Sequence, residues 1–166
     1  MNCSLRTVGP AQRAQLERIT AATGLFRPAE VATAVELLDA MVAGDDDYRF
    51  VGAYDGDVLA GYACWGPTPG TQGTADLYWI VVDPVRQRRG VGTALLSAVE
   101  TELAAGSYRL VVVETSARPD YAPTRAFYER RGFHVAATIP DYYAPGDDLR
   151  IYLKDLRHGV LARTPA

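Results

Sequence analysis

Glycine and arginine side chains gather in one short stretch whose composition suits a phosphate. Glycine has no Cβ atom, so an anion can approach the backbone closely, and arginine donates charge-assisted hydrogen bonds. A helix that begins here adds unpaired N–H groups and a positive dipole end. We therefore expect a pyrophosphate site, although this stretch alone fits a relaxed turn with a solvated basic face equally well. The stretch reads Arg86-Gln87-Arg88-Arg89-Gly90-Val91-Gly92.

The segments on either side predict a strand, a turn and a helix. Leu77 to Val82 is a β-branched and aromatic run that ends before Asp83-Pro84, where proline removes a backbone donor. No Gly-Lys-Ser/Thr follows, which excludes a P-loop, and Leu95 stands where a dinucleotide fingerprint needs a small residue. Apolar spacing predicts a helix that Gly106 ends, with Val91, Leu95, Ala98 and Val99 on one face and Glu102 at its margin.

One further group could transfer a proton. Glu114 closes the predicted strand Tyr108 to Thr115, and a predicted helix from Ala122 to Arg131 follows that strand. Desolvation at the end of a buried strand raises the pKa of a carboxyl group towards the range of a general base. An exposed or arginine-paired Glu114 is a nearly equal alternative, and Asp76 is the reserve candidate.

The two motifs together resemble the GNAT N-acetyltransferase superfamily. Gln87-x-x-Gly90-x-Gly92, after Val-Asp-Pro, is similar to its acetyl-CoA-binding motif, and the segment Phe127 to Phe133 is similar to its Phe-Tyr-Glu-x-x-Gly-Phe signature. The resemblance covers nearly the whole chain. It implies an α/β fold in a single domain, residues 1–166: a mixed, mostly antiparallel sheet of about six or seven strands, with a central splayed parallel pair and about four flanking helices.

The resemblance also implies roles for individual residues. Tyr128 would protonate the departing thiolate, and Glu114 would be the base, through a water molecule. A backbone N–H near Val82 would polarise the thioester carbonyl, and no acyl-enzyme would form. The family's coenzyme-contacting asparagine is Tyr121 here, after an insertion, so we assign that position no role. The coenzyme would be held by the backbone of Ile80, Val81 and Val82 and, at its pyrophosphate, by Arg88, Arg89, Gly90, Val91, Gly92 and Thr93.

The resemblance favours an acetyl-CoA-dependent N-acetyltransferase that acts on a small-molecule primary amine. A peptide N-terminus or a lysine is the alternative acceptor, and a non-catalytic acyl-CoA-binding regulatory module is the alternative of another class. A cationic amine suits an acidic acceptor site, which Asp141, Asp147 and Asp148 could supply. In relatives that acetylate ribosomal-protein N-termini, a tyrosine pair flanks the acceptor, and Tyr142-Tyr143 of this chain resembles that pair.

Composition limits the other possibilities. The net charge of −3 over 166 residues argues against general nucleic-acid binding, which needs a positive field. No apolar run reaches the length of a membrane span or a signal peptide, so we expect a cytoplasmic protein, and a homodimer is compatible with the sequence. Only His134 and His158 are histidines, which argues against a zinc site, and we expect no metal.

The remaining segments alternate between helices, strands and turns. We expect Cys64 to be a small core residue and Pro67 to Thr74 to be an exposed loop that either borders the substrate or merely connects. An Asp-Gly turn between two strand runs predicts a hairpin. The expected helices are 11–22 and 28–43, the first strand 5–8, the hairpin strands 48–54 and 58–65, the later strands 133–139 and 149–156, and the last loop 141–148.

Overall fold

The structure, a computed structural model, describes residues 3–157, and the chain divides into two compact units. Unit 1 holds the residues up to Pro67 together with Tyr78–Glu102, and unit 2 holds Thr68–Leu77 and the residues from Leu103 onward. One strand, β4 (Thr74–Val82), contributes to both units. The single domain stays a prediction, and His158 lies outside the described residues.

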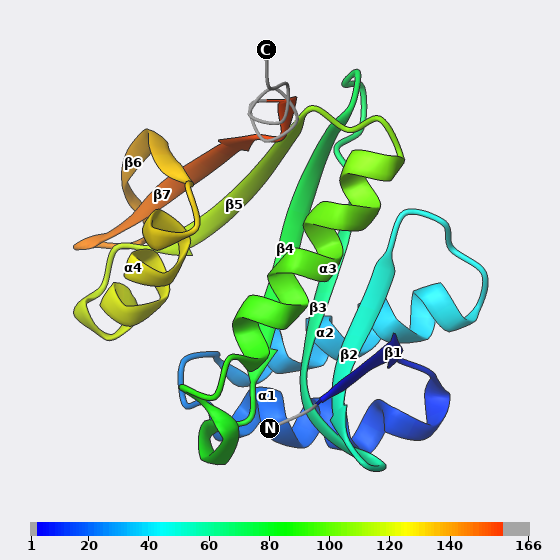
Figure 1. Cartoon of the computed structure of the whole chain (residues 1–166). Helices are drawn as coiled ribbons and strands as arrows, with labels where there is room; N and C mark the ends of the chain where they lie inside the picture. Colours follow the sequence, from blue (N-terminus) through cyan, green and yellow to red (C-terminus); the bar gives the residue numbers. More distant parts are fainter. Residues whose placement is uncertain (1–2, 158–166) are drawn as a thin grey trace. The chain divides into compact units, whose positions relative to one another are not determined.

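Seven strands form one mixed sheet in the order β1-β2-β3-β4-β5-β7-β6 (Figure 1). β5 pairs in parallel with β4, and the other described registers are antiparallel. The predicted mixed sheet with one parallel pair is therefore confirmed. The strands besides β4 are β1 (Ser4–Thr7), β2 (Arg49–Asp55), β3 (Val58–Pro67), β5 (Leu110–Ser116), β6 (His134–Ala144) and β7 (Asp147–Asp155).

Four α-helices accompany the sheet, as predicted. Three short 3₁₀ segments precede or join them: η1 (Pro10–Gln12), η2 (Pro84–Arg86) and η3 (Pro119–Tyr121). Gly24 and Gly44 follow the first two helices with φ of 68° and 99°, a backbone conformation that glycine adopts without steric cost. The α-helices are α1 (Arg13–Ala22), α2 (Pro28–Val42), α3 (Val91–Ala105) and α4 (Ala122–Arg130).

The parallel ladder between β4 and β5 is short. It pairs Thr74, Ala75 and Asp76 with Leu110, Val111 and Val112, in that order. β4 nevertheless runs on to Val82 and β5 to Ser116. Within the described residues, the ladder therefore stops well before either strand ends.

Unit 1 has its core between the sheet and its first two helices. α1 and α2 lie on one face of the strands and α3 on the other (Figure 1). The core includes Leu16, Leu38, Tyr62 and Val81, all at most 2% exposed, and Cys64 is fully buried as predicted. Each such side chain contributes about 1.5–3 kcal/mol to folding through the area it removes from water.

In unit 2 an aromatic cluster holds α4 to the strands. The Tyr128 ring meets Phe133 edge-on at 5.4 Å between centroids and Tyr152 at 6.3 Å. Gly132, with φ of 84°, ends the helix and returns the chain to β6. The Tyr-Glu-x-x-Gly-Phe sequence therefore forms a helix end that is packed on its own strand.

One predicted loop is wrong. Residues 141–148 do not form a loop, because β6 runs to Ala144 and β7 begins at Asp147. Ala144 and Asp147 pair directly, so only Pro145-Gly146 connects the strands. Gly146 has φ of 79°, as the third position of a tight turn requires.

The apolar face of α3 also differs from the prediction. Leu96 and Leu103 are each 2% exposed, and Glu102 is exposed. The buried stripe is wider than the predicted face of Val91, Leu95, Ala98 and Val99, because a core-facing helix buries more than a narrow seam. The residue with positive φ after this helix is Ser107, at 65°, and Gly106 is not among the glycines with positive φ.

Gly61 on β3 allows close approach of β3 and β4. A Cβ atom built there would lie 2.6 Å from the Val81 carbonyl oxygen and 3.2 Å from a Leu95 methyl carbon. Gly61→Ala must therefore displace backbone, and we expect it to lower the free energy of unfolding by about 1–3 kcal/mol, measured by urea denaturation. Gly9→Ala is the control, because its Cβ would meet only Gln12 Oε1 at 3.6 Å. Equal urea midpoints for the two variants would contradict this account.

Candidate active site

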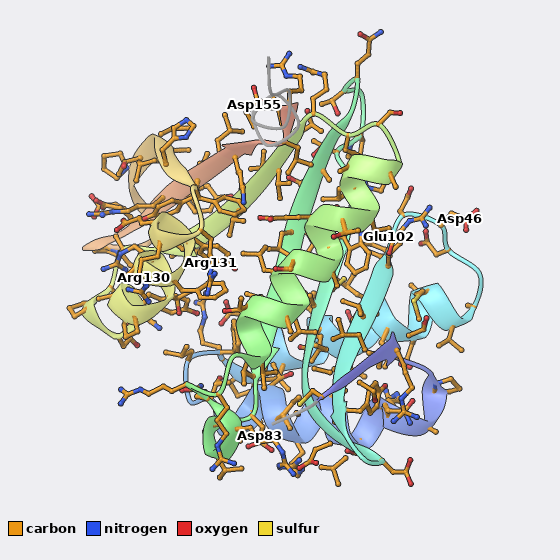
Figure 2. The ribbon with its side chains drawn as sticks, in the orientation of Figure 1. Asp46, Asp83, Glu102, Arg130, Arg131 and Asp155 are labelled. Atoms are coloured by element: carbon orange, nitrogen blue, oxygen red, sulfur yellow. The ribbon has the colours of Figure 1, made fainter. Side chains whose placement is uncertain are left out.

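The turn between β4 and α3 is organised by a buried carboxylate. Asp83 is 3% exposed, and its Oδ1 accepts a hydrogen bond from the Val85 N–H at 3.2 Å (Figure 2). Its carbonyl oxygen accepts from the Arg86 N–H at 2.8 Å. These two bonds close η2 directly after the strand.

Two guanidinium groups compensate the buried charge of Asp83. Arg18 lies 3.3 Å and Arg86 3.6 Å from Asp83 Oδ2, and Arg86 also lies 3.6 Å from Asp55 on β2. Burying a carboxylate without such partners is costly. Arg86 thus pairs with two carboxylates and helps to fix this turn, and its role as a phosphate donor stays a prediction.

The residues after η2 leave the backbone open. Arg88 and Gly90 have positive φ, 60° and 84°, and a Cβ at Gly90 would meet nothing within 4 Å. The Gly90 carbonyl oxygen accepts from the Ala94 N–H at 2.9 Å, which begins α3. The N–H groups of the first helical turn have no carbonyl four residues earlier in the helix. This turn can therefore receive a phosphate oxygen.

The predicted phosphate residues differ in exposure. Arg88, Arg89 and Gly90 are exposed, Val91 is buried, and Gly92 and Thr93 are half-buried. They form a continuous segment in unit 1, with two exposed arginines at its start. The Gln87 amide donates to the Val82 carbonyl oxygen at 3.4 Å, which ties the motif glutamine to the end of β4.

The end of β4 presents an amide away from β3. The Asp83 N–H donates to Ala60 on β3 at 2.9 Å. Because successive N–H groups of a strand point to opposite sides, the Val82 N–H points away from β3. Ile80 and Val82 are half-buried, and Val81 belongs to the core at 2% exposed.

Unit 2 holds the predicted base. Glu114 is exposed and lies opposite Ile151 of β7. Partial desolvation, and next the nearby Asp76 carboxylate, raise the pKa of Glu114 above its ordinary value. The predicted direction of the shift is correct, although the strand is less buried than expected: Leu110 and Val112 are half-buried.

A tyrosine pair lies at the hairpin near Glu114. Burial, together with the charge of Glu114, raises the pKa of Tyr143 to about 12. The ring of Tyr143 meets Tyr142 edge-on at 5.0 Å between centroids, and Tyr142 is 56% exposed. Glu114 and Tyr143 are thereby brought together from β5 and β6.

The three aspartates proposed as an acidic acceptor site bind the protein's own groups. Asp147 accepts from the Ser116 hydroxyl, Asp141 from the Gly146 N–H at 2.6 Å, and Asp148 from the Asp141 N–H at 3.0 Å. Asp141 and Asp148 thus shape the turn, and Asp147 joins it to β5.

The predicted acid is buried in the same unit. Tyr128 is 3% exposed, and burial raises the pKa of its hydroxyl. A tyrosine in this state is protonated at neutral pH, as a proton donor must be.

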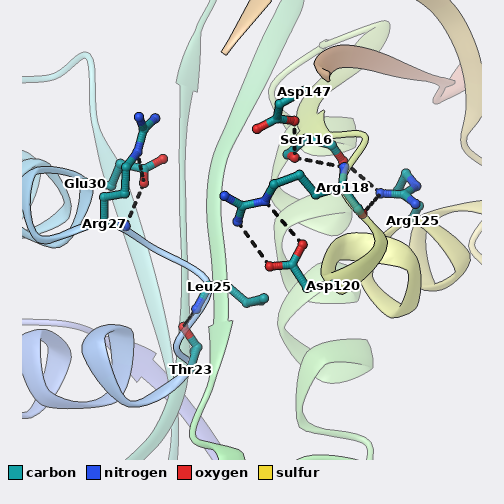
Figure 3. A network of polar contacts seen from close by, with 9 residues as sticks. All are labelled: Thr23, Leu25, Arg27, Glu30, Ser116, Arg118, Asp120, Arg125 and Asp147. Atoms are coloured by element: carbon teal, nitrogen blue, oxygen red, sulfur yellow. Dashed lines mark hydrogen bonds and ion pairs between the residues drawn. The ribbon is translucent and has the colours of Figure 1, made fainter. Parts of the chain in front are cut away.

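Hydrogen bonds hold the segment 116–121, which includes the position of the family's asparagine (Figure 3). Arg125 of α4 donates to the carbonyl oxygens of Ser116 and Arg118, each at 2.8 Å. Arg118 pairs with both oxygens of Asp120 at 3.2 Å, and its guanidinium lies 5.3 Å from the Tyr121 ring centroid. The loop is therefore held from both ends of its sequence.

A second network in Figure 3 belongs to unit 1, after α1. The Leu25 N–H donates to the Thr23 hydroxyl at 3.3 Å, and the Arg27 N–H donates to Glu30 at 2.7 Å. These bonds fix the segment that connects α1 to α2.

Comparison with known families decides the identity. Residues 16–133 match the model of the acetyltransferase (GNAT) family. The chain belongs to this family. It is therefore an acyltransferase, and the matched range includes both the glycine turn and Tyr128.

Individual GNAT relatives agree in fold. A GNAT-family protein from Desulfovibrio desulfuricans is 43% identical, with a TM-score of 0.89, over 93% of this chain and 99% of its own. The Escherichia coli ribosomal-protein-S18-alanine N-acetyltransferase is 22% identical, with a TM-score of 0.78, over 93% and 94%. A Thermoplasma acidophilum PaiA N-acetyltransferase, solved with coenzyme A, is 17% identical, with a TM-score of 0.73, over 93% and 99%.

A curated relative matches over a shorter range. It is the S-(2-succino)cysteine N-acetyltransferase of Bacillus subtilis, 29% identical over 69 residues. The match covers 42% of this chain and 42% of that enzyme. This GNAT chain thus shares less than half its length with that relative.

Clusters of metal ligands and membrane-spanning helices are both absent from the described part of the chain. Among residues 3–157, no group of three or more His, Cys, Asp and Glu side chains is placed to hold a metal ion. None of the described helices is both long and apolar enough to cross a membrane.

The sequence did not reveal one partner in this GNAT site. The Thr68 hydroxyl donates to Asp76 Oδ2 at 2.8 Å, from the segment predicted only as a loop. No periodicity or motif connects these residues, since a loop residue reaches a strand residue by tertiary structure. The nearby turn residues Thr68-Pro69-Gly70 were the only available signal.

The raised pKa of Glu114 has a consequence for stability. A carboxyl group whose folded pKa exceeds its unfolded pKa favours folding below the unfolded pKa, and this contribution is lost as the pH rises through the folded pKa. Glu114→Gln should therefore raise the urea midpoint at pH 7 relative to the wild type, and the difference should shrink as the pH falls to about 4. A lower midpoint at pH 7 would contradict the assigned direction of the shift.

Proposed function

We propose that this GNAT enzyme transfers the acetyl group of acetyl-CoA directly to a primary amine of a small molecule. The observation that carries the proposal is the pair of proton-transfer groups in unit 2. Glu114 has a raised pKa, which suits a base, and Tyr128 is a buried, protonated hydroxyl, which suits an acid. A base that frees the amine and an acid that protonates the departing thiolate each speed the transfer of an acyl group from sulfur to nitrogen.

The glycine turn of unit 1 supports acetyl-CoA as the co-substrate. Open space at Gly90, the exposed Arg88 and Arg89, and the first turn of α3 together suit a pyrophosphate. The Val82 N–H, directed away from β3, suits a carbonyl oxygen of the acyl-pantetheine arm. A relative solved with coenzyme A supports the same assignment.

The proposed reaction combines proton transfers with the formation of a C–N bond and the cleavage of the C–S bond. Glu114, through a water molecule, removes a proton from the acceptor ammonium, and the free amine attacks the thioester carbonyl carbon. The C–S bond then breaks, the thiolate takes the Tyr128 proton, and the second proton of the nitrogen returns through water to the Tyr128 oxygen, which gives an N-acetyl amine and coenzyme A. Glu114 then releases its proton to solvent.

An acidic acceptor side favours a small cationic amine. Glu114 and Asp76 add negative charge where the amine must lose its proton, and the Bacillus subtilis relative is named for a cysteine derivative. A peptide N-terminus or lysine is the second candidate, because exposed Tyr142 and half-buried Tyr143 could flank a peptide. A non-catalytic acyl-CoA-binding module has less support, since it would need neither Glu114 nor Tyr128.

The direct test is acetyl-CoA turnover, followed as free thiol, against a panel of small amines, amino acid derivatives and short peptides. Amine-dependent thiol release with a small molecule, and an acetylated product by mass spectrometry, would support the proposal. Turnover with peptides alone would favour the second candidate. Saturable acetyl-CoA binding without turnover on any amine would favour the non-catalytic module.

Tyr128→Phe separates catalysis from binding. Since the hydroxyl acts only as the C–S bond breaks, its loss should lower kcat by about 10²-fold or more with little change in acetyl-CoA affinity. Tyr152→Phe is the matched control: it removes a hydroxyl that donates to Glu129 at 2.9 Å, and kcat should stay within a few-fold. An unchanged kcat in Tyr128→Phe would remove this residue from the mechanism.

A further inference from the structure

Glu114 has a second carboxylate, Asp76, as its neighbour. We propose that Asp76, held by Thr68, is a positioning residue that makes Glu114 the proton acceptor of the pair. The proposal rests on the proposed function in one respect only: it takes Glu114 as the base of the acyl transfer.

The strand register places the two carboxylates on one face. Asp76 of β4 pairs with Val112 of β5, and side chains of directly paired residues share a face of the sheet. Glu114 lies two residues beyond Val112 on the same strand, so it returns to that face. The last pair of the parallel ladder thus presents Asp76 and Glu114 as diagonal neighbours.

A single hydrogen bond distinguishes the two carboxylates. The Thr68 hydroxyl donates to Asp76 Oδ2 at 2.8 Å, and Asp76 is half-buried. This bond fixes the Asp76 carboxylate beside Glu114, whose pKa is raised by partial desolvation and then by the charge of Asp76.

The loop that carries Thr68 is itself fixed. The Thr68 N–H donates to the Thr74 carbonyl oxygen at 2.9 Å. Arg109, before β5, donates from its side chain to Gln72 at 2.8 Å and from its N–H to Gly73 at 2.6 Å. The segment first regarded as an exposed loop is thus tied to both strands of the ladder, which keeps the Thr68 hydroxyl on Asp76.

Other titratable groups face this region from neighbouring elements. Tyr143 comes from β6, Tyr121 from η3 and Asp147 from β7, and all three interact electrostatically with one another or with Glu114. The tyrosines are neutral at physiological pH, and Asp147 accepts from Ser116. Asp76 is the carboxylate that raises the pKa of Glu114.

Such a pair makes Glu114 a better base for an ammonium group. A carboxylate of ordinary pKa is a weak acceptor for an amine proton, and a raised pKa brings it closer to the working pH. The ionised Asp76 also attracts a cationic acceptor. The expected acceptor class is therefore a protonated amine rather than an alcohol or a thiol.

The test is Asp76→Asn, a substitution that keeps an acceptor oxygen for Thr68 and changes the volume little. Carbon-13 NMR of the glutamate side-chain carboxyls, with Glu114 identified by its absence in Glu114→Gln, should show Glu114 titrating at lower pH than in the wild type. The acidic limb of kcat/KM should move to lower pH in parallel, with a lower plateau. Thr68→Val should shift the titration in the same direction by less, because it releases the Asp76 carboxylate from its hydrogen bond without removing its charge.

Asp155→Asn is the control, since it removes a carboxylate of the same unit that is bound to Arg157 at 2.6 Å. It should leave the Glu114 titration unchanged. An unshifted Glu114 in Asp76→Asn would overturn the proposal. So would loss of kcat at every pH, which would make Asp76 the base itself.

The two proposals fail in different ways. A shifted Glu114 titration in a protein that acetylates no amine would refute the proposed function but leave the carboxylate pair intact. If the enzyme is active but Asp76→Asn changes neither the Glu114 titration nor the pH profile, the proposed role of Asp76 is refuted and the proposed function stands.

Discussion

β4 pairs in parallel with β5 only as far as Asp76, and the arrangement of the candidate groups depends on this short ladder. Backbone N–H and C=O groups need partners, and a strand that outruns its ladder keeps some of them for a ligand. β4 continues to Val82 and β5 to Ser116. The Val82 N–H comes from the continuation of β4 in unit 1, and Glu114 comes from the continuation of β5 in unit 2.

The turn after β4 shows how the fold holds an open anion site without losing its shape. Asp83 is buried and satisfied by Arg18, Arg86 and the Val85 N–H, so the chain direction is fixed before the glycines begin. Arg88 and Gly90 can then adopt positive φ with their backbone exposed. The fixed turn at Asp83 and the exposed backbone at Arg88 and Gly90 together preorganise the first turn of α3 for a phosphate.

Local signals predicted most of the fold. The Asp-Gly turn at Asp55–Asp57 and the glycines after α1 and α2 have short-range causes, and these elements lie where they were expected. The 141–148 segment was mistaken for a loop because its glycine and proline suggested a long connection, whereas two residues suffice for the turn. The ion pair of Arg86 with Asp55 was not predicted, because Asp55 lies on a distant strand.

The candidate site was predictable in type but not in its supporting contacts. Glu114 and Tyr128 follow from motifs and strand ends, and the structure gives Glu114 the expected direction of pKa shift. The Thr68 hydroxyl on Asp76 is a tertiary contact that no spacing encodes. Motifs therefore point to candidate groups, whereas the folded chain decides which neighbours lie beside them.

Calorimetric titration of the purified protein with acetyl-CoA is the most direct test of the central claim, that this chain binds an acyl-CoA through the glycine turn and the end of β4. Adenosine diphosphate is the control ligand, and Gly92→Leu is the variant that places a bulky side chain in the glycine turn. The account predicts saturable binding of acetyl-CoA, much weaker binding of adenosine diphosphate, and loss of affinity in Gly92→Leu. Absent binding, equal affinity for both ligands, or an unaffected Gly92→Leu variant would contradict it.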